Sequence, residues 1–584
     1  MGSTMFLSLS GLLSLISSSA IPDRPNVLII LADDLGYGDL ACYGSPNHIF
    51  NPIDQLAADG LRFTHFYSAD SLCTPARAGL MTGRLPVRSG IVGGRRVFIN
   101  KDTGGLPATE FTIPEMFRKA GYTTGMVGKW HLGINKFNSS DGTHLPHNHG
   151  FDYVGINLPF SNLWECDETG VFMEEPDKSL CFLYNGSKIV QQPIYHENLT
   201  EMLIDGYKHF IQTNKPGPFF FYFSLPHVHT DLYVSEGFKG KTKSGLFGDH
   251  LDEMGWIVGV IRDVLRKAGL ENNTLTLFLS DHGPHREICL AGGSTGELKG
   301  GKANHFEGGF RIPAIAHWPG VIQAGGVSDA VLSAMDLLPT LAELVNVSLP
   351  SDRVYDGLES LDKLLGKDTT CPRVPERCII YYCNRKLMAV RYGLHKIHFY
   401  TVPYVTVAET GEFCPAGWPL KDWYVSQLCP DEEVTFHEPP LVYHLEHDPA
   451  EAYPLNATDV SDIIAAAKEC RKQHLDSLVP VPEQLGNFDD AVIPCCNPPK
   501  SSSVVQQPGT PSGVRAPVYT GLEGENLEWE PGQQADHSTP VSAQIPLASL
   551  SVQDFEDNIQ PSRVQTAPHS GGSTPTEESA LRQS

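Results

Sequence analysis

A run of five aliphatic residues at 27–31 constrains the fold most, because such a run is typical of a strand buried on both faces of a sheet. Three further apolar runs follow along the chain, at 218–223, 275–279 and 312–316. Helical patterns lie between them, at 114–120 and 249–268. This alternation predicts an α/β fold with a large, mostly parallel sheet covered by helices.

Pairs of titratable side chains follow four strand-like runs, one of which lies at 122–127. These pairs are Asp33 and Asp34, Lys129 and His131, His227 and His229, and Asp281 and His282. In open α/β sheets a ligand lies beyond the carboxyl ends of the strands. A single Asp or His there is usually a cap or turn residue, but four coinciding pairs favour a functional site.

Composition and charge narrow the function further. The chain has 584 residues, of which 41% are hydrophobic, so disorder throughout is excluded. The formal net charge of −25 argues against non-specific binding to nucleic acid or to anionic membranes, since phosphate-rich surfaces would repel the chain. An anionic substrate therefore requires a local cationic pocket.

The amino terminus predicts entry into the secretory pathway. An apolar run at 5–16 precedes small residues that end at Ala20, so we expect a cleaved signal peptide over residues 1–20. No later apolar stretch has the length that a membrane-spanning helix needs. Six glycosylation sequons agree with secretion, and they begin at Asn138, Asn185, Asn198, Asn272, Asn346 and Asn456.

Two further regions are expected after a catalytic α/β domain at 21–377. Residues 378–498 combine strand-like segments with a helical stretch at 460–473, which predicts a small α+β domain. Residues 499–584 are rich in Ser, Pro, Gln, Gly and Thr and predict a disordered tail. The chain has thirteen cysteines, and with Cys73 set aside their clustering at 371–496 suits disulfides in the smaller domain. The pairing stays open.

The most specific motif is Ser-Leu-Cys-Thr-Pro-Ala-Arg at 71–77, followed by Leu-Met-Thr-Gly-Arg at 80–84. It resembles the signature of the sulfatase family, in which Cys-x-Pro-Ser/Ala-Arg directs a formylglycine-generating enzyme to oxidise the cysteine to formylglycine. Cys73 matches that cysteine. Four other segments resemble the remaining sulfatase blocks in order, and they lie at 25–44, 128–133, 280–283 and 300–309. The resemblance extends to about residue 498 and implies an alkaline-phosphatase-like fold.

The local sequence gives this motif a physical reason. Pro75 suits the first turn of a helix, where its missing N–H group costs nothing. Cys73 then lies at the helix N-terminus, where free N–H groups and the helix dipole favour an anion such as a sulfate ester. Arg77, one turn further, can reach back to the same centre. The alternative for Cys73 is a half-cystine or a buried thiol.

The resemblance implies hydrolysis of a sulfate ester to an alcohol or phenol and inorganic sulfate through a formylglycine-sulfate intermediate. It also implies one metal ion, which lowers the pKa of the formylglycine hydrate and neutralises sulfate oxygens. The matching ligands are Asp33, Asp34, Cys73, Asp281 and His282, although several arylsulfatases have an amide in place of His282. This oxygen-rich set suits Ca²⁺ or, less well, Mg²⁺. Taken alone, the Asp pair at 33–34 could be a solvated turn.

The remaining site residues follow from the same resemblance. Lys129 and His131 match residues that bind the formylglycine hydroxyls and sulfate, and they are two apart on an expected strand, which puts both on one face. His229 and Lys302 match the pair that contacts sulfate and protonates the leaving oxygen. His227 is an alternative to His229, and a surface loop is the alternative for Lys302. Ser161 is a further expected substrate contact.

Within the family, the segments at 382–384 and 299–304 resemble arylsulfatases related to steryl-sulfatase, without the membrane hairpin of that relative. We therefore expect a secreted, extracellular or lysosomal arylsulfatase with no membrane span. Two interpretations compete with this one. The first is a phosphomonoesterase or phosphonate hydrolase, and the second is an inactive extracellular protein of the same fold. The choice among aryl, steroid and carbohydrate sulfates stays open, as does the oligomeric state.

Overall fold

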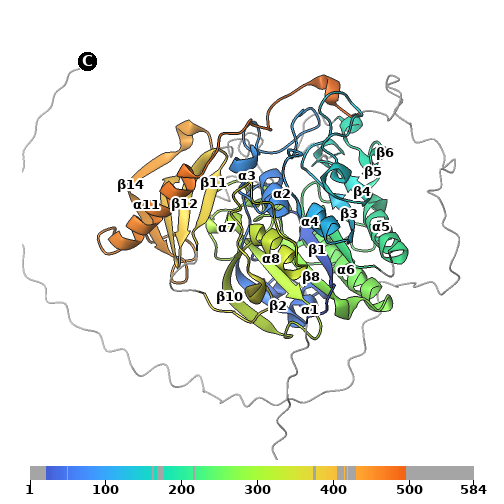
Figure 1. The fold of residues 1–584 in the computed structure, drawn as a ribbon, viewed down its shortest axis with the longest axis horizontal. Coiled ribbons are helices and arrows are strands. Elements are labelled where there is room, and N and C mark those ends of the chain that lie inside the picture. Colours follow the sequence, from blue (N-terminus) through green and yellow to red (C-terminus); the bar gives the residue numbers. More distant parts are fainter. Residues whose placement is uncertain are drawn as a thin grey trace, which may run out of the picture. The chain divides into compact units, whose positions relative to one another are not determined.

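The computed structural model describes residues 21–494 except 49, 161–162, 167–176, 215–216, 372–376, 404–413, 415–416 and 418–428 (Figure 1). The predicted signal peptide at 1–20, the predicted tail at 499–584 and Ser161 lie outside the described residues.

A ten-stranded sheet forms the larger part of the fold, in the order β10-β2-β9-β8-β1-β7-β3-β4-β5-β6. Its five neighbouring strands β8, β1, β7, β3 and β4 are parallel. The strands are β1 Asn26–Ala32, β2 Leu61–Tyr67, β3 Thr123–Lys129, β4 Tyr153–Leu158, β5 Leu183–Asn185, β6 Lys188–Gln191, β7 Phe219–Ser224, β8 Thr274–Ser280, β9 Arg311–His317 and β10 Gly326–Ser333.

The predicted α/β class is confirmed, and the sheet proves to be mixed. The strand expected at 312–316 is β9, which runs antiparallel to both of its neighbours, β8 and β2. Strands β4, β5 and β6 also pair antiparallel. The run at 27–31 is buried on both faces as expected, because Val27, Ile29 and Leu31 join one apolar cluster while Leu28 and Ile30 join another.

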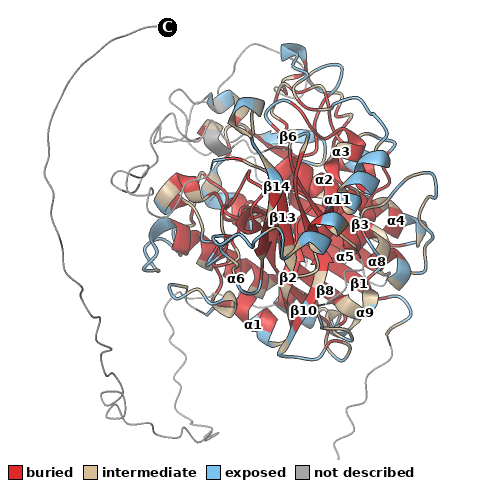
Figure 2. Cartoon of the chain, turned by 90° about the vertical axis from the view of Figure 1, so that its left-hand side faces the viewer, coloured by how far each residue is buried: buried red, intermediate tan, exposed pale blue. Residues whose placement is uncertain are grey.

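Helices cover both faces of this sheet, and the buried residues between the layers form its core (Figure 2). Helix α4 begins with a capping box between Thr112 and Glu115. The helices are α1 Pro52–Ala58, α2 Cys73–Thr82, α3 Pro86–Ser89, α4 Ile113–Lys119, α5 Leu199–Thr213, α6 Gly245–Lys267, α7 Glu307–Phe310, α8 Leu337–Leu344, α9 Leu361–Leu364 and α11 Ser461–Asp476. None of them is long and apolar enough to cross a membrane.

A four-stranded antiparallel sheet follows in the order β11-β12-β13-β14. Its strands are β11 Ile379–Cys383, β12 Lys386–Tyr392, β13 His395–Thr401 and β14 Thr435–His444. Ile464 and Ala467 of α11 pack against this sheet in one apolar cluster. The two sheets also share a cluster, in which Tyr67 and Phe310 contact Tyr381. Residues of the small sheet can therefore reach elements that border the large one.

The disulfides only partly follow the expected clustering. Two pairs, Cys378–Cys470 and Cys383–Cys429, lie within the C-terminal region. The pair Cys166–Cys181 lies outside it, and Cys289–Cys414 joins it to the segment after β8. Cys73 forms no disulfide among the described residues, and neither do Cys42 and Cys371, while Cys495 and Cys496 lie outside the described residues.

Candidate active site

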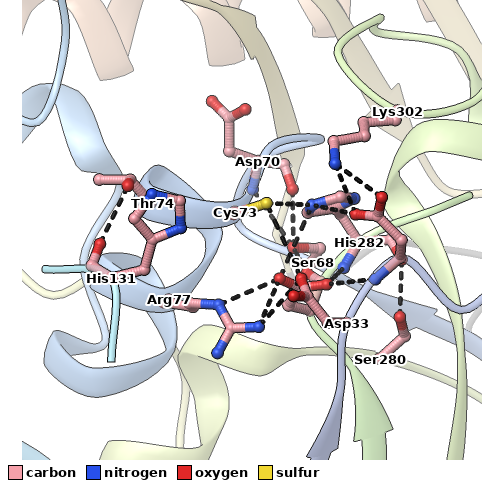
Figure 3. Close-up of polar contacts among 12 residues, drawn as sticks. Asp33, Ser68, Asp70, Cys73, Thr74, Arg77, His131, Ser280, His282 and Lys302 are labelled. Carbon is pink, nitrogen blue, oxygen red and sulfur yellow. Dashed lines mark hydrogen bonds and ion pairs between the residues drawn. The ribbon is translucent and has the colours of Figure 1, made fainter. Parts of the chain in front are cut away.

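A compact group of charged side chains surrounds Cys73 at the carboxyl ends of the central parallel strands. In Figure 3 the Cys73 sulfur faces the His282 ring, and Arg77 and Lys302 approach from different sides. Helix α2 begins at Cys73, as predicted, and its N-cap residue Leu72 makes no side-chain capping bond. The first N–H groups of the helix are therefore directed at this group without a side-chain cap.

Asp33 lies directly after β1 and is paired with two cations. Lys129 Nζ at the end of β3 forms an ion pair with Asp33 Oδ2, and Arg77 Nη2 lies 3.2 Å from Asp33 Oδ1. Burial opposes ionisation, but the charges of Lys129 and Arg77 lower the pKa of Asp33 below its ordinary value. Asp33 is therefore a carboxylate at neutral pH.

Arg77 connects three strands through its guanidinium group, which is fully buried. Its Nε and Nη2 atoms donate to Asp281 Oδ2 at 3.1 and 2.9 Å. Its Nη1 atom donates to Ser224 Oγ at 2.6 Å and to the Lys129 carbonyl at 3.2 Å. The guanidinium hydrogen bonds, which we call the Arg77 fork, join the ends of β3, β7 and β8. Arg77 therefore keeps these three strand ends in fixed relative positions beneath the charged group.

Asp34 forms the other side of the group. Lys302 Nζ donates to both of its carboxylate oxygens, at 2.8 and 2.6 Å. His282 Nε2 lies 3.4 Å from Asp34 Oδ1, and the Asp34 N–H group donates to Asp281 Oδ1 at 3.1 Å. Asp34 has a φ of 60°, so the chain turns sharply after β1 and sends the two neighbouring carboxylates to different partners.

The surroundings of Cys73 stabilise negative charge. His282 Nε2 lies 3.3 Å from Cys73 Sγ, and the Cys73 residue is 2% exposed. Burial opposes ionisation of the thiol, yet Lys129 and Lys302 lower the pKa of Cys73 well below its ordinary value of 9.0. The same cations would attract an anionic group bound next to this side chain.

His131 reaches the group by a different route from the one predicted. Strand β3 ends at Lys129, and His131 follows it with a φ of 60°, so the alternation of a strand does not place the two side chains. The Nε2 atom of His131 bonds to the Phe98 carbonyl oxygen at 3.0 Å. Burial lowers the pKa of His131 to about 4, which keeps its imidazole neutral and able to accept a proton.

The structure separates the two histidines that follow β7. An imidazole nitrogen of His229 lies within 4.8 Å of ligand-type atoms of both Asp34 and Cys73. His227 turns away, and its ring centroid lies 4.3 Å from that of His250. His227 contributes its backbone instead, since its carbonyl accepts the Asp33 N–H group at 2.7 Å.

The five residues predicted to bind metal form two overlapping groups. Ligand-type atoms of Asp33, Cys73, Asp281 and His282 lie within 4.8 Å of one another, and Asp34 forms the second group with Cys73 and His229. Burial raises the pKa of Asp281 to about 6, and the negative charge of Asp33 adds to the rise. Three neighbouring carboxylates are a donor set that fits a hard divalent cation.

Two residues that were not predicted from the sequence, Ser224 and Arg96, support the group. Ser224 is the last residue of β7 and accepts a hydrogen bond from Arg77. Its position at a strand end was the signal from which it could have been predicted. Arg96 is buried, with a φ of 64°, and its Nη2 donates to Asp70 Oδ1 at 2.8 Å. Its Nη1 donates to the carbonyl of Ala303, the residue after Lys302, at 2.7 Å. No local pattern marks this long-range contact.

Comparison with known proteins decides the family. A model of the sulfatase family matches residues 25–347, which include every charged residue of the group. The chain belongs to the sulfatase family. A second model, for the C-terminal region of aryl-sulfatase, matches residues 374–503. This sulfatase is therefore a sulfuric ester hydrolase, and its family generally uses formylglycine and a divalent metal.

Three relatives define its place in the family. The arylsulfatase of Hemicentrotus pulcherrimus is 44% identical over 499 residues, which cover 85% of this chain and 90% of the relative. Human steryl-sulfatase is 35% identical over 543 residues, covering 80% of this chain and 91% of the relative. The crystal structure of the PsFucS1 sulfatase from Pseudoalteromonas sp. superposes with a TM-score of 0.64 at 28% identity, over 80% of this chain and 92% of that one. The predicted resemblance to arylsulfatases related to steryl-sulfatase is confirmed.

Proposed function

We propose that Cys73 is the residue converted to formylglycine and that sulfate esters are hydrolysed at the group around it. The observation that carries this proposal is the placement of Cys73 at an uncapped helix N-terminus, with the Lys129, Lys302 and Arg77 cations nearby. Hydrated formylglycine supplies one hydroxyl for attack at sulfur and a second whose deprotonation expels inorganic sulfate.

The catalytic residues act on two parts of the reaction, the formylglycine at position 73 and the leaving oxygen of the ester. Lys129, which pairs with Asp33, binds sulfate oxygens, and the neutral imidazole of His131, which lies beside Cys73, takes up a proton. His229 and Lys302 lie on the Asp34 side, where they bind sulfate and give a proton to the leaving oxygen. Arg77 keeps the floor of the site fixed and adds positive charge. Ser161, outside the described residues, stays a proposed substrate contact.

We assign the metal as one Ca²⁺ ion held by Asp33, Asp34, Asp281, His282 and the modified Cys73. Carboxylate oxygens dominate this set, and Ca²⁺ accepts more oxygen ligands in looser geometry than Mg²⁺ does. Bound there, the ion would neutralise sulfate oxygens and lower the pKa of the attacking hydroxyl. Dialysis against a chelator specific for Ca²⁺ should remove activity, and Ca²⁺ should restore it better than Mg²⁺. Recovery with Zn²⁺ alone would contradict the assignment.

The route to the cell exterior or the lysosome is proposed on similar grounds. All six sequon asparagines are exposed, so each is accessible to the glycosylation machinery. This route begins with a signal peptide at 1–20 and includes processing by the formylglycine-generating enzyme. We also propose that the catalytic domain ends at residue 377 and that the C-terminal domain begins at residue 378. Secreted protein should lose mass when N-glycans are removed enzymatically. Protein confined to the cytosol and unchanged by that treatment would contradict the route.

An aryl sulfate is the substrate class to test first, since arylsulfatase and steryl-sulfatase are among the relatives. We expect the protein from a eukaryotic host to hydrolyse an aryl sulfate at least about 100-fold faster than the matching aryl phosphate. Cys73→Ala should abolish the sulfatase activity and leave the fold intact. A preference for the phosphate would favour the phosphomonoesterase interpretation, and no activity with either ester would favour an inactive protein.

A further inference from the structure

A second group of buried charges lies where the two sheets meet. It consists of Glu307 at the start of α7, Lys396 and His398 on β13, and Glu451 after β14, and we call it the Glu451 cluster. All four residues have 0% relative exposure. Charged residues are almost never fully buried unless they are paired, because removing them from water is costly. The burial of this cluster therefore needs a structural explanation.

Glu451 contacts the cluster and its surroundings through its carboxylate and through its carbonyl oxygen. Its Oε1 atom accepts His398 Nε2 at 2.6 Å and lies 3.4 Å from Lys396 Nζ. Its Oε2 atom accepts the backbone N–H group of Glu307 at 2.8 Å. Its carbonyl oxygen accepts Lys299 Nζ at 3.0 Å. Glu451 therefore binds Lys299 and Glu307, two residues that lie between strands β8 and β9 of the large sheet.

These two residues bracket the loop that carries Lys302. The loop is closed at the same ends by a bond from the Gly308 N–H group to the Lys299 carbonyl at 2.7 Å. Between them, Lys302 reaches Asp34, and the Ala303 N–H group donates to the Ser71 carbonyl at 2.7 Å. The loop thus spans the distance from Glu451 to the turn that precedes Cys73.

The Glu307 carboxylate fixes the far end of the loop. Tyr67 from β2 donates to its Oε2 at 2.8 Å, and Tyr381 from β11 donates to its Oε1 at 2.8 Å. Lys396 Nζ adds a bond to Oε1 at 3.1 Å. One ammonium group, that of Lys396, is therefore shared between Glu307 and Glu451, which couples the small sheet to both ends of the Lys302 loop.

We propose that Glu451 is a positioning residue for Lys302, so that the small C-terminal sheet takes part in catalysis by setting the place of the group that protonates the leaving oxygen. This inference rests on the proposed role of Lys302. A displacement of Lys302 affects leaving groups unequally, because a basic leaving oxygen needs the proton in the transition state and an acidic phenol does not.

The test compares two aryl sulfates, one with a good leaving group (para-nitrophenyl sulfate) and one with a poor leaving group (para-methoxyphenyl sulfate). For Glu451→Gln we expect kcat/KM to fall on the order of 100-fold for the poor leaving group and less than about 5-fold for the good one. Lys302→Ala should show the same inequality more strongly. A KM that stays within about twofold would assign the loss to kcat.

A second variant and a control guard against a general loss of folding. Lys299→Met keeps the apolar stem but removes the tether to the Glu451 carbonyl, and we expect the same inequality in weaker form. Glu110→Gln breaks another buried pair, with Arg84 at 2.7 Å, and should lower both rates equally or not at all.

Two results would overturn the inference, and they are distinguishable. Equal effects of Glu451→Gln and Lys299→Met on both esters, while Lys302→Ala is unequal, would refute the positioning role and leave the proposed function standing. Equal effects of Lys302→Ala itself would refute its proposed role as proton donor and the positioning role with it.

Discussion

The site around Cys73 and the Glu451 cluster are both buried groups of opposite charges, but they differ in how their donor atoms converge. Around Cys73, ligand-type atoms of Asp33, Cys73, Asp281 and His282 lie within 4.8 Å of one another, as do those of Asp34, Cys73 and His229. In the Glu451 cluster all four carboxylate oxygens of Glu307 and Glu451 accept hydrogen bonds from the protein. Beside Cys73, Ser71 Oγ is buried without a hydrogen-bond partner among the described residues.

The difference separates a group that binds a ligand from a group that binds other parts of the chain. Three carboxylates and three cations face one another around Cys73, and a divalent ion and a sulfate group would change the partners of each. In the Glu451 cluster both carboxylates have their partners within the protein, whereas His398 Nδ1 has no hydrogen-bond partner among the described residues. Substitutions in the first group should therefore mainly change the reaction rate, and those in the second should mainly change stability and the position of Lys302.

The largest expected effect comes from Asp281→Asn. This change takes one carboxylate from the proposed metal site and weakens the Arg77 fork. We expect kcat/KM to fall on the order of 1,000-fold or more, because metal stabilisation of the transition state is worth several kcal/mol. Sulfate release measures the rate, and calorimetric titration with Ca²⁺ measures the loss of binding. Unchanged Ca²⁺ affinity would contradict the assignment of Asp281 as a ligand.

Glu307→Gln tests the other region. The change leaves the buried Lys396 ammonium with weaker compensation, so we expect the free energy of unfolding to fall by about 3–5 kcal/mol. Denaturant unfolding followed by tryptophan fluorescence measures this loss. A drop of less than about 1 kcal/mol would show that Glu307 is not the main partner of Lys396.

The pH dependence of stability offers a finer comparison. Burial raises the pKa of Glu451 to about 7 from an ordinary value of 4.5, against the opposing charge of Lys396. Burial also raises the pKa of Asp39 to about 7. The folded protein then binds protons that the unfolded chain releases, so the free energy of unfolding should fall as pH rises from about 4.5 to about 7.

Glu451→Gln and Asp39→Asn should each flatten this dependence by up to about 1 kcal/mol per pH unit. Unfolding by urea at a series of pH values measures the slope. A slope that stays the same in both variants would show that neither carboxyl group holds its proton in the folded state.

The smallest effect is expected at the surface. Asp205 and Lys208 form an exposed ion pair on α5, with atoms 3.3 Å apart. Asp205→Asn should change the free energy of unfolding by less than about 0.5 kcal/mol and leave the rate unchanged. A larger change would mean that this exposed pair contributes stability of the kind expected for the buried Glu451 cluster.

Much of the central sheet could be predicted from the sequence, because a doubly buried strand leaves a continuous apolar run. The run at 27–31 corresponds to β1, and the polar pairs after it and after β8 converge as expected. The direction of β9 could not be predicted, since an apolar run has the same pattern in a parallel and in an antiparallel strand.

The details of the site depended on backbone conformations that a sequence does not signal. His131 has a left-handed φ, which no residue pattern at 129–131 indicates. The choice between His227 and His229 likewise depends on how the chain turns after β7. The contact between Glu307 and Glu451 joins residues 144 positions apart, so only the folded chain could reveal it.

Mass spectrometry of the peptide that contains residues 71–77 is the most direct test of the central claim, the conversion of Cys73. The protein should be purified from a eukaryotic host that has a formylglycine-generating enzyme. We predict a peptide mass that corresponds to an aldehyde in place of the Cys73 thiol, and reaction of that peptide with an aldehyde-specific hydrazide. A peptide that still carries the free thiol, or one joined by a disulfide to another cysteine, would contradict the account.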